Sequence, residues 1–214
     1  MLKYTRLAMI AIALLMIGAA TVAQAKPAPP PPPDYFPLKV GDWWKYRWTT
    51  KDGKSAEFTM KVVELEGTGA DALTVVDTIM PTQVIREWYS KPAGWVLVHR
   101  IAYPKNPDLK ADYAPVRKLL ENPLVVGHKW SWTGKGMMDV DIQDDITVGA
   151  SEKVVVPAGT FGAMRVDSTV VQGGQNVEKH YWYANHIGLV KSTTKSGNVE
   201  SVNELIDYSF KPKR

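Results

Sequence analysis

Apolar and polar side chains alternate along most of the chain after residue 42. Phe58, Met60 and Val62, for example, are separated by single polar residues. A period of two residues is that of a β-strand, because successive side chains of a strand point to opposite faces. The pattern therefore predicts strands that bury one face and leave the other in water.

Short turn signals separate these runs. Asp52-Gly53 follows a tryptophan-rich run, and Gly173-Gly174 and Ser196-Gly197 divide later ones. Short loops of this composition favour antiparallel hairpins. About ten strands are predicted, with one or two of the following runs merged: 42–50, 55–65, 71–79, 83–90, 94–102, 127–133, 137–147, 150–156, 161–172, 177–184, 187–195 and 199–210.

One short helix is predicted, at residues 115–121, within a long proline-containing connection. No segment with helical periodicity is long enough to cross over between parallel strands. The expected fold class is therefore all-β, a curved antiparallel sheet that forms a half-barrel or an open barrel.

The N-terminus has the three parts of a secretory signal peptide. Lys3 and Arg6 precede the apolar run 7–18, and small residues lead to a cleavage site between Ala25 and Lys26. The alternative is a retained anchor, but the run is shorter than the roughly 20 residues that span a bilayer. We expect residues 1–25 to be removed, leaving no membrane span and a periplasmic or secreted protein.

Residues 26–34 are rich in proline and predict an extended linker, and residues 35–214 are expected to form a single domain. The chain has no cysteine, which excludes disulfides, cysteine nucleophiles and cysteine-ligated metals. The net charge is only +4, and Lys3 and Arg6 contribute two of those charges. Nucleic-acid binding therefore has no support.

Residues 37–46 and 123–132 are similar to one another. Both contain Pro-Leu, then Val-Gly, and then two aromatic residues spaced two apart. In a strand, that spacing places both rings on one face. Either the sheet has two related halves, or two strands meet the same packing requirement; the sequence leaves both alternatives open.

Three segments resemble the signatures of a broad group of bacterial secreted proteins and lipoproteins of unknown function: residues 36–46, 156–166 and 182–191. The resemblance implies a curved antiparallel sheet, half-barrel or barrel, somewhat like periplasmic carriers of lipid-modified proteins. It implies no catalytic residues. Many members of the group are lipoproteins, whereas this chain lacks a cysteine for lipid attachment.

Eight tryptophans are the main candidate binding residues. A curved sheet lined with aromatic rings can hold an apolar ligand, although large rings also fill cores. The candidate ligand-binding residues are Trp44, Tyr46, Trp48, Trp130, Trp132 and Trp182, on a concave face.

Enzymatic chemistry has weaker candidates. His180 and His186 could serve a hydrolase or a metal-dependent enzyme, but no His-Glu-x-x-His pattern or nucleophile elbow is present. Asp139, Asp141, Asp144 and Asp145 lack the glycine and glutamate of an EF-hand loop, and their alternation with apolar residues predicts the solvated face of a strand.

The sequence thus predicts a non-catalytic exported protein of the cell envelope, without a cofactor or metal. Its expected ligand is an apolar small molecule, a lipid or the acyl chain of a lipoprotein. The alternatives are a structural or assembly protein that binds another envelope protein, and, with less support, an enzyme that uses His180 and His186.

Overall fold

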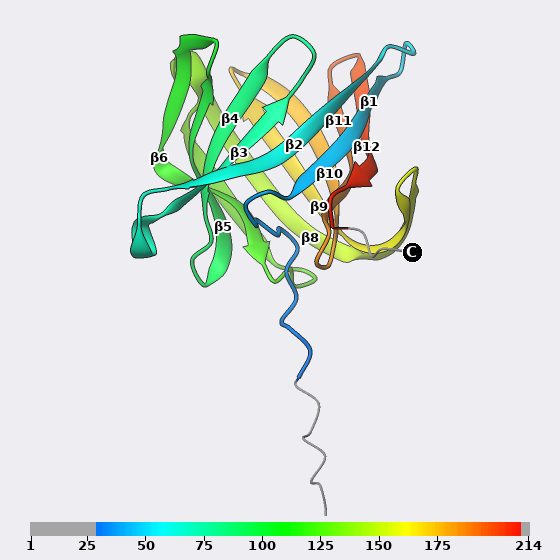
Figure 1. Ribbon diagram of the computed structural model, residues 1–214. Coiled ribbons are helices and arrows are strands. Elements are labelled where there is room, and N and C mark those ends of the chain that lie inside the picture. Colours follow the sequence, from blue (N-terminus) through cyan, green and yellow to red (C-terminus); the bar gives the residue numbers. More distant parts are fainter. Residues whose placement is uncertain (1–28, 211–214) are drawn as a thin grey trace, which may run out of the picture. The chain divides into compact units, whose positions relative to one another are not determined.

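The alternating residues form twelve strands of one antiparallel sheet in the computed structural model, which describes residues 29–210 (Figure 1). Two short 3-10 helices, η1 (Gly69–Asp71) and η2 (Met137–Asp139), interrupt the meander. The strands are β1 (Trp43–Thr50), β2 (Ser55–Glu66), β3 (Leu73–Ile79), β4 (Val84–Ser90), β5 (Gly94–Tyr103), β6 (Asn106–Asn122), β7 (Lys129–Lys135), β8 (Asp141–Val156), β9 (Gly159–Gln172), β10 (Gln175–Ala184), β11 (Gly188–Ser196) and β12 (Val199–Tyr208).

Every strand pairs with its neighbours in sequence, except at one point. The order is β6-β5-β4-β3-β2-β1-β12-β11-β10-β9-β8-β7, so β1 pairs with β12 and joins two meanders of six strands. The sheet curls until its two outermost strands, β6 and β7, lie side by side (Figure 1). The predicted all-β fold is confirmed, and the half-barrel is nearly closed.

One local prediction is wrong, and one merger of the kind that the sequence allowed is observed. Residues 115–121 are not helical but belong to β6, a strand of 17 residues that occupies most of the predicted connection. From Asp141 onward, the runs 137–147 and 150–156 merge into one long strand, β8, with a bulge opposite β9 between Val148 and Ser151, whereas Met137–Asp139 form η2. The bulge accommodates the change in alternation that suggested two strands.

The predicted signal segment, with its cleavage site at Ala25 and Lys26, and the basic tail at 211–214 lie outside the described residues. Within the predicted linker, residues 29–33 are exposed and have no regular secondary structure.

The seam between β6 and β7 has no β-ladder in the described chain. Two tryptophans of β7 bridge it. The indole N–H of Trp130 donates to the carbonyl oxygen of Lys118 at 3.2 Å, and that of Trp132 donates to the carbonyl oxygen of Pro115 at 3.0 Å. These bonds satisfy main-chain acceptors that a ladder would otherwise use.

Ring packing reinforces the seam. Trp130 meets Trp95 of β5 edge to face, with ring centroids 5.5 Å apart, and Trp132 meets Tyr113 of β6 in the same way. Such pairs add about 0.5–1.5 kcal/mol each beyond the area they bury. The seam is therefore held by side chains rather than by backbone pairing.

The two similar sequence segments form the same turn. Gly41 and Gly127 both have positive φ, at 95° and 85°. The Gly41 amide donates to the carbonyl oxygen of Val62 on β2, and the Gly127 amide donates to that of Val148 on β8, each at 2.9 Å. Each segment thus introduces the first strand of one six-stranded meander, which favours two related halves.

Gly134 of β7 gives a direct test of the seam. A Cβ atom at Gly134 would lie 2.3 Å from the Trp132 ring, so Gly134→Ala must displace the indole. We expect a loss of about 1–3 kcal/mol in the free energy of unfolding, as for other overpacked sites, measured by urea denaturation.

Gly162→Ala is the matched control, because a Cβ at this β9 glycine meets nothing within 4 Å. It is expected to change the free energy of unfolding by less than about 0.5 kcal/mol. Equal effects of the two substitutions would show that Trp132 does not hold the seam.

Candidate functional site

A short N-terminal segment, residues 34–38, closes one end of the barrel and is called here the plug. The plug precedes β1 in the chain (Figure 1). Its Phe36 ring packs against Tyr89 of β4 and Tyr183 of β10, with centroids 5.4 and 6.4 Å away. Pro37 lies over Gly188, where an added Cβ would come within 3.4 Å of the proline ring. The absence of a side chain at Gly188 thus lets the plug pack closely against the start of β11.

Asp34 holds the plug to three separate parts of the sheet. Its carboxylate accepts hydrogen bonds from Lys91 at 2.7 and 2.8 Å and from Asn122 at 2.9 Å. Its main chain bonds to the β10–β11 turn through Asn185 and His186. Burial alone would raise the pKa of Asp34, but the hydrogen bonds from Lys91, the Phe36 amide and Asn122 lower it below its ordinary value.

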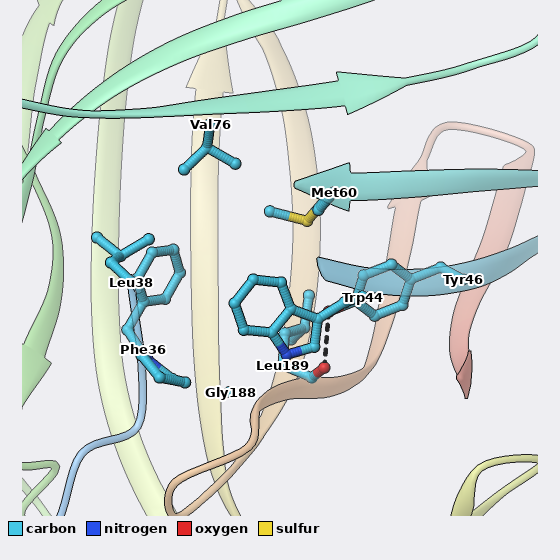
Figure 2. A pocket seen from close by; sticks show the side chains of 9 residues that line it. Phe36, Leu38, Trp44, Tyr46, Met60, Val76, Gly188 and Leu189 are labelled. Atoms are coloured by element: carbon cyan, nitrogen blue, oxygen red, sulfur yellow. Dashed lines mark hydrogen bonds between the residues drawn. The ribbon is translucent and has the colours of Figure 1, made fainter. Parts of the chain in front are cut away.

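Between the plug and the barrel wall lies an apolar recess with a free volume of about 20 Å³ (Figure 2). Tyr46 forms part of the wall of the recess, and the Tyr46 hydroxyl donates to the carbonyl oxygen of Leu189 at 2.8 Å. The Trp44 indole N–H donates to the carbonyl oxygen of Ile187 at 2.6 Å. The recess is lined by Phe36, Pro37, Leu38, Trp44, Tyr46, Met60, Val76, Gly188 and Leu189.

The recess adjoins a group of polar side chains that also face inward, called here the polar cluster. Glu87 of β4 is the direct cross-strand partner of Val76, which lines the recess. Tyr181 of β10 is the next inward residue after Tyr183, which contacts the plug. The polar cluster consists of Glu87, Tyr113, Arg117, Asp144, Ser168, Lys179 and Tyr181.

An ion pair lies at the centre of the polar cluster. Arg117 Nη2 donates to Asp144 Oδ2 at 2.8 Å, and the Ser168 hydroxyl donates to Asp144 Oδ1 at 2.6 Å. The Arg117 guanidinium also lies over the Trp132 ring, 5.7 Å from its centroid. Because Arg117 is on β6 and Asp144 is on β8, this pair also spans the seam.

Burial shifts the pKa values of the polar cluster. It raises the pKa of Glu87, although the hydrogen bond from Tyr89 and the charge of Arg117 act in the opposite direction. Burial, followed by the charge of Arg117, lowers the pKa of Lys179. Burial raises the pKa of Tyr181 to about 12. The interior thus disfavours the charged forms of all three groups.

The six predicted aromatic residues do not form one surface. Trp44 and Tyr46 line the recess, whereas Trp130 and Trp132 are buried at the seam. Trp48 is only partly buried, near the β1–β2 turn. No observation shows that any of them binds a ligand, so that role stays a prediction.

Trp182 lies on the face of β10 opposite to Tyr181 and Tyr183, so its predicted place on the concave face is wrong. Its indole donates to Glu152 on the outside of the sheet at 2.9 Å, and Arg165 lies over its ring. The register of β10 against β11 shifts between Trp182 and Tyr183, but Trp182 remains on this outer face of β10.

The structure does not bring the two candidate histidines into a shared site. His180 pairs with Asp167 through Nδ1 at 2.5 Å on the outer face, beside Arg165. His186 occupies the β10–β11 turn with a φ of 58°, and its amide donates to Asp34. Among the described residues, no three His, Asp or Glu side chains gather closely enough to hold a metal ion.

The sequence interpretation missed the plug residues and the polar cluster. Asp144 is a correction: it is 4% exposed and faces the interior with Ile142 and Ile146, not the solvated face. The sequence contained a signal for this, because Asp144 lies two residues from both Ile142 and Ile146 and therefore shares their face of the strand. Arg117 had no such signal, because bulges interrupt the pairing of β5 with β6. In the described part of the chain, no helix is long and apolar enough to cross a membrane.

The fold and site together define a nearly closed antiparallel barrel with one plugged end and a partly polar interior. A family model described as DUF3108-like matches residues 96–205, and the chain belongs to that family. The match includes the second and third signature segments but not the first, which contains most of the plug. No curated protein matches the chain.

Two solved structures share the fold. A candidate lipoprotein of Parabacteroides distasonis is 14% identical, with a TM-score of 0.54, over 84% of this chain and 100% of that chain. A candidate exported protein of Bacteroides fragilis with a YmcC-like fold is 15% identical, with a TM-score of 0.53, over 83% of this chain and 99% of that chain. At this identity the likeness concerns the fold alone.

Glu87 predicts a specific pH dependence of stability. Because its pKa is raised in the folded protein, its contribution is fully present below the ordinary value of 4.5 and is lost as the pH rises through the folded value. Glu87→Gln keeps an acceptor for the Tyr89 hydroxyl and removes the ionisation. We expect the variant to match the wild type in acid and to be more stable at neutral pH, measured by urea denaturation across that range.

Glu178→Gln is the control for the loss of one negative charge, because Glu178 is exposed on the same sheet. It should leave the pH profile of the wild type unchanged. A stability difference between Glu87→Gln and the wild type that stays constant with pH would contradict the buried ionisation.

Proposed function

We propose that this chain is a non-catalytic binding domain of the bacterial cell envelope that holds an apolar chain, such as an acyl group, in the recess beneath its plug. The observation that carries the proposal is the recess itself. Its lining residues are all apolar or aromatic, and the polar atoms of Trp44 and Tyr46 bond to main-chain carbonyls rather than facing the free volume.

The way in which the plug is attached supports the proposal that a ligand can displace it from the recess. The free volume of about 20 Å³ holds little more than one water-sized group. Phe36 and Leu38 of the plug line one side of the recess, opposite Trp44 and Met60 (Figure 2). The plug is attached through hydrogen bonds of Asp34, Tyr35 and Phe36 and not through a β-ladder. An acyl chain that displaces it would bury similar apolar area at the cost of a few hydrogen bonds.

Export is part of the proposal. The predicted signal peptide at residues 1–25 supports it. The two proteins of similar structure, a candidate lipoprotein and a candidate exported protein, also support it. The proposed location of the domain is the periplasm or the outside of the cell.

The two alternatives have less support. An enzyme built on His180 and His186 would need them to act together, and they lie in an outer-face ion pair and in a turn. An assembly protein that pairs through a sheet edge would need a free edge, and β6 and β7 face one another across the seam. Neither arrangement favours those functions.

Shortening the plug side chains tests the proposal. In Phe36→Ala/Leu38→Ala the plug vacates the recess, so less apolar contact must be broken when a ligand enters. We expect dodecanol to bind this variant about tenfold more tightly than the wild type, since about 1.4 kcal/mol of contact need no longer be displaced. The measurement is a titration followed by tryptophan fluorescence, with Trp44→Phe assigning the signal to the recess.

Val40→Ala is the matched control, because Val40 is 46% exposed and lies outside the recess on the same stretch of chain. It should bind dodecanol as the wild type does. If neither the wild type nor the double variant binds dodecanol, the recess is part of a packed core and the proposed function is wrong.

A further inference from the structure

In the polar cluster, the positively charged side chains outnumber the carboxylates that are held in ion pairs. Arg117 and Lys179 both face inward, on β6 and β10. A buried cation is costly unless it is paired and hydrogen-bonded. Their partners therefore determine what the interior can bind.

Arg117 is only partly paired. Its Nη2 donates to Asp144, but its Nε atom is buried and has no hydrogen-bond partner among the residues that the structure describes. Nε and Nη2 together form the edge of the guanidinium that can hold both oxygens of one oxyanion. Asp144 occupies half of that edge, because its other oxygen accepts from Ser168.

Lys179 is the second cation. Its cross-strand partner on β9 is Ser168, whose hydroxyl is directed to Asp144. Between residues 29 and 210, no hydrogen bond or ion pair involves the Lys179 ammonium group. Burial lowers the pKa of Lys179, which is the expected response of an ammonium group without a counter-ion.

The remaining negative group does not balance these charges. Glu87 accepts a hydrogen bond from Tyr89 at 2.8 Å and takes part in no ion pair of the described chain. Its raised pKa shows that burial favours its neutral form. Asp144 is therefore the one carboxylate of the polar cluster in an ion pair, and it pairs with Arg117 but not with Lys179.

Solvent reaches this part of the interior. The Arg117 side chain is 19% exposed, and Glu87, Lys179 and Tyr181 are each partly exposed although they face inward. An inward row of cross-strand neighbours continues from Tyr181 through Ser192 to Asn203. The two cationic side chains are therefore partly accessible to solvent, while the Nε atom of Arg117 itself is buried.

We propose that Arg117 and Lys179 form a binding site inside the barrel for an oxyanion group, a carboxylate or a phosphate. The free Nε of Arg117 and the ammonium group of Lys179 donate to the anion, and the ion pair with Asp144 fixes the guanidinium in place. The site does not require the apolar recess, although Glu87 and Val76 place the two next to each other.

The test uses Lys179→Met, which removes the charge, keeps most of the side-chain length and leaves no described partner unpaired. Lys153→Met is the matched control, because Lys153 is exposed on β8. Arg117→Lys is a second variant that keeps a positive charge for Asp144 and removes Nε. Each purified protein is titrated by calorimetry with dodecanoate, dodecanol, acetate and inorganic phosphate, and its unfolding temperature is measured with each.

The wild type and Lys153→Met should prefer an anion, and Lys179→Met and Arg117→Lys should each bind it about tenfold more weakly, as for the loss of one charge-assisted hydrogen bond. A preference for dodecanoate over dodecanol identifies the anion as an amphiphile headgroup. Stabilisation by acetate or phosphate alone identifies a free anion. Either result supports the site.

No anion preference in the wild type, or a preference that Lys179→Met and Arg117→Lys both retain, would overturn the site. Equal binding of dodecanol and dodecanoate to all variants would do the same while leaving the proposed function of the recess intact. Anion binding without any dodecanol binding would support the oxyanion site and contradict the proposed function of the recess.

Discussion

The closure of the barrel depends on side chains that bridge β6 and β7. The indoles of Trp130 and Trp132 donate to carbonyl oxygens of β6, and Arg117 reaches Asp144 beyond β7. Without these contacts the sheet would be an open half-barrel with two unpaired edges. Closure is also what buries Arg117, Glu87 and Lys179, so the unusual electrostatics of the interior are a consequence of the seam.

The two six-stranded meanders begin with the same kind of turn, but the strand that follows it has a different role in each. In each, a glycine with positive φ turns the chain, and two inward aromatic residues follow on the first strand. In β1 that pair, Trp44 and Tyr46, forms the wall of the recess. In β7 the corresponding pair closes the seam. The residues before each turn also differ: Leu124 is buried in the core, while Leu38 belongs to the plug.

The interior is divided between two chemical environments. Beside the plug, apolar residues surround a recess, whereas the inward positions next to it carry charges that are incompletely paired. Burial of charged groups is tolerated only where hydrogen bonds or ion pairs compensate it, and here the Arg117–Asp144 pair compensates one cation of two. A ligand with an apolar chain and an anionic end matches both environments.

The alternation of side chains was enough to predict an all-β chain and to place most strands within a few residues, because period two is a local property of the backbone. It also placed Trp44 and Tyr46 together. It could not place Trp182, Arg117 or Lys179, since the chemistry of a side chain does not specify which face of a strand is enclosed. That depends on the direction in which the whole sheet curls and on the bulges of β5 and β6. The sequence by itself determined the strands and their turns; only the tertiary structure decided which residues share an interior, because closure joins strands that are distant in the chain.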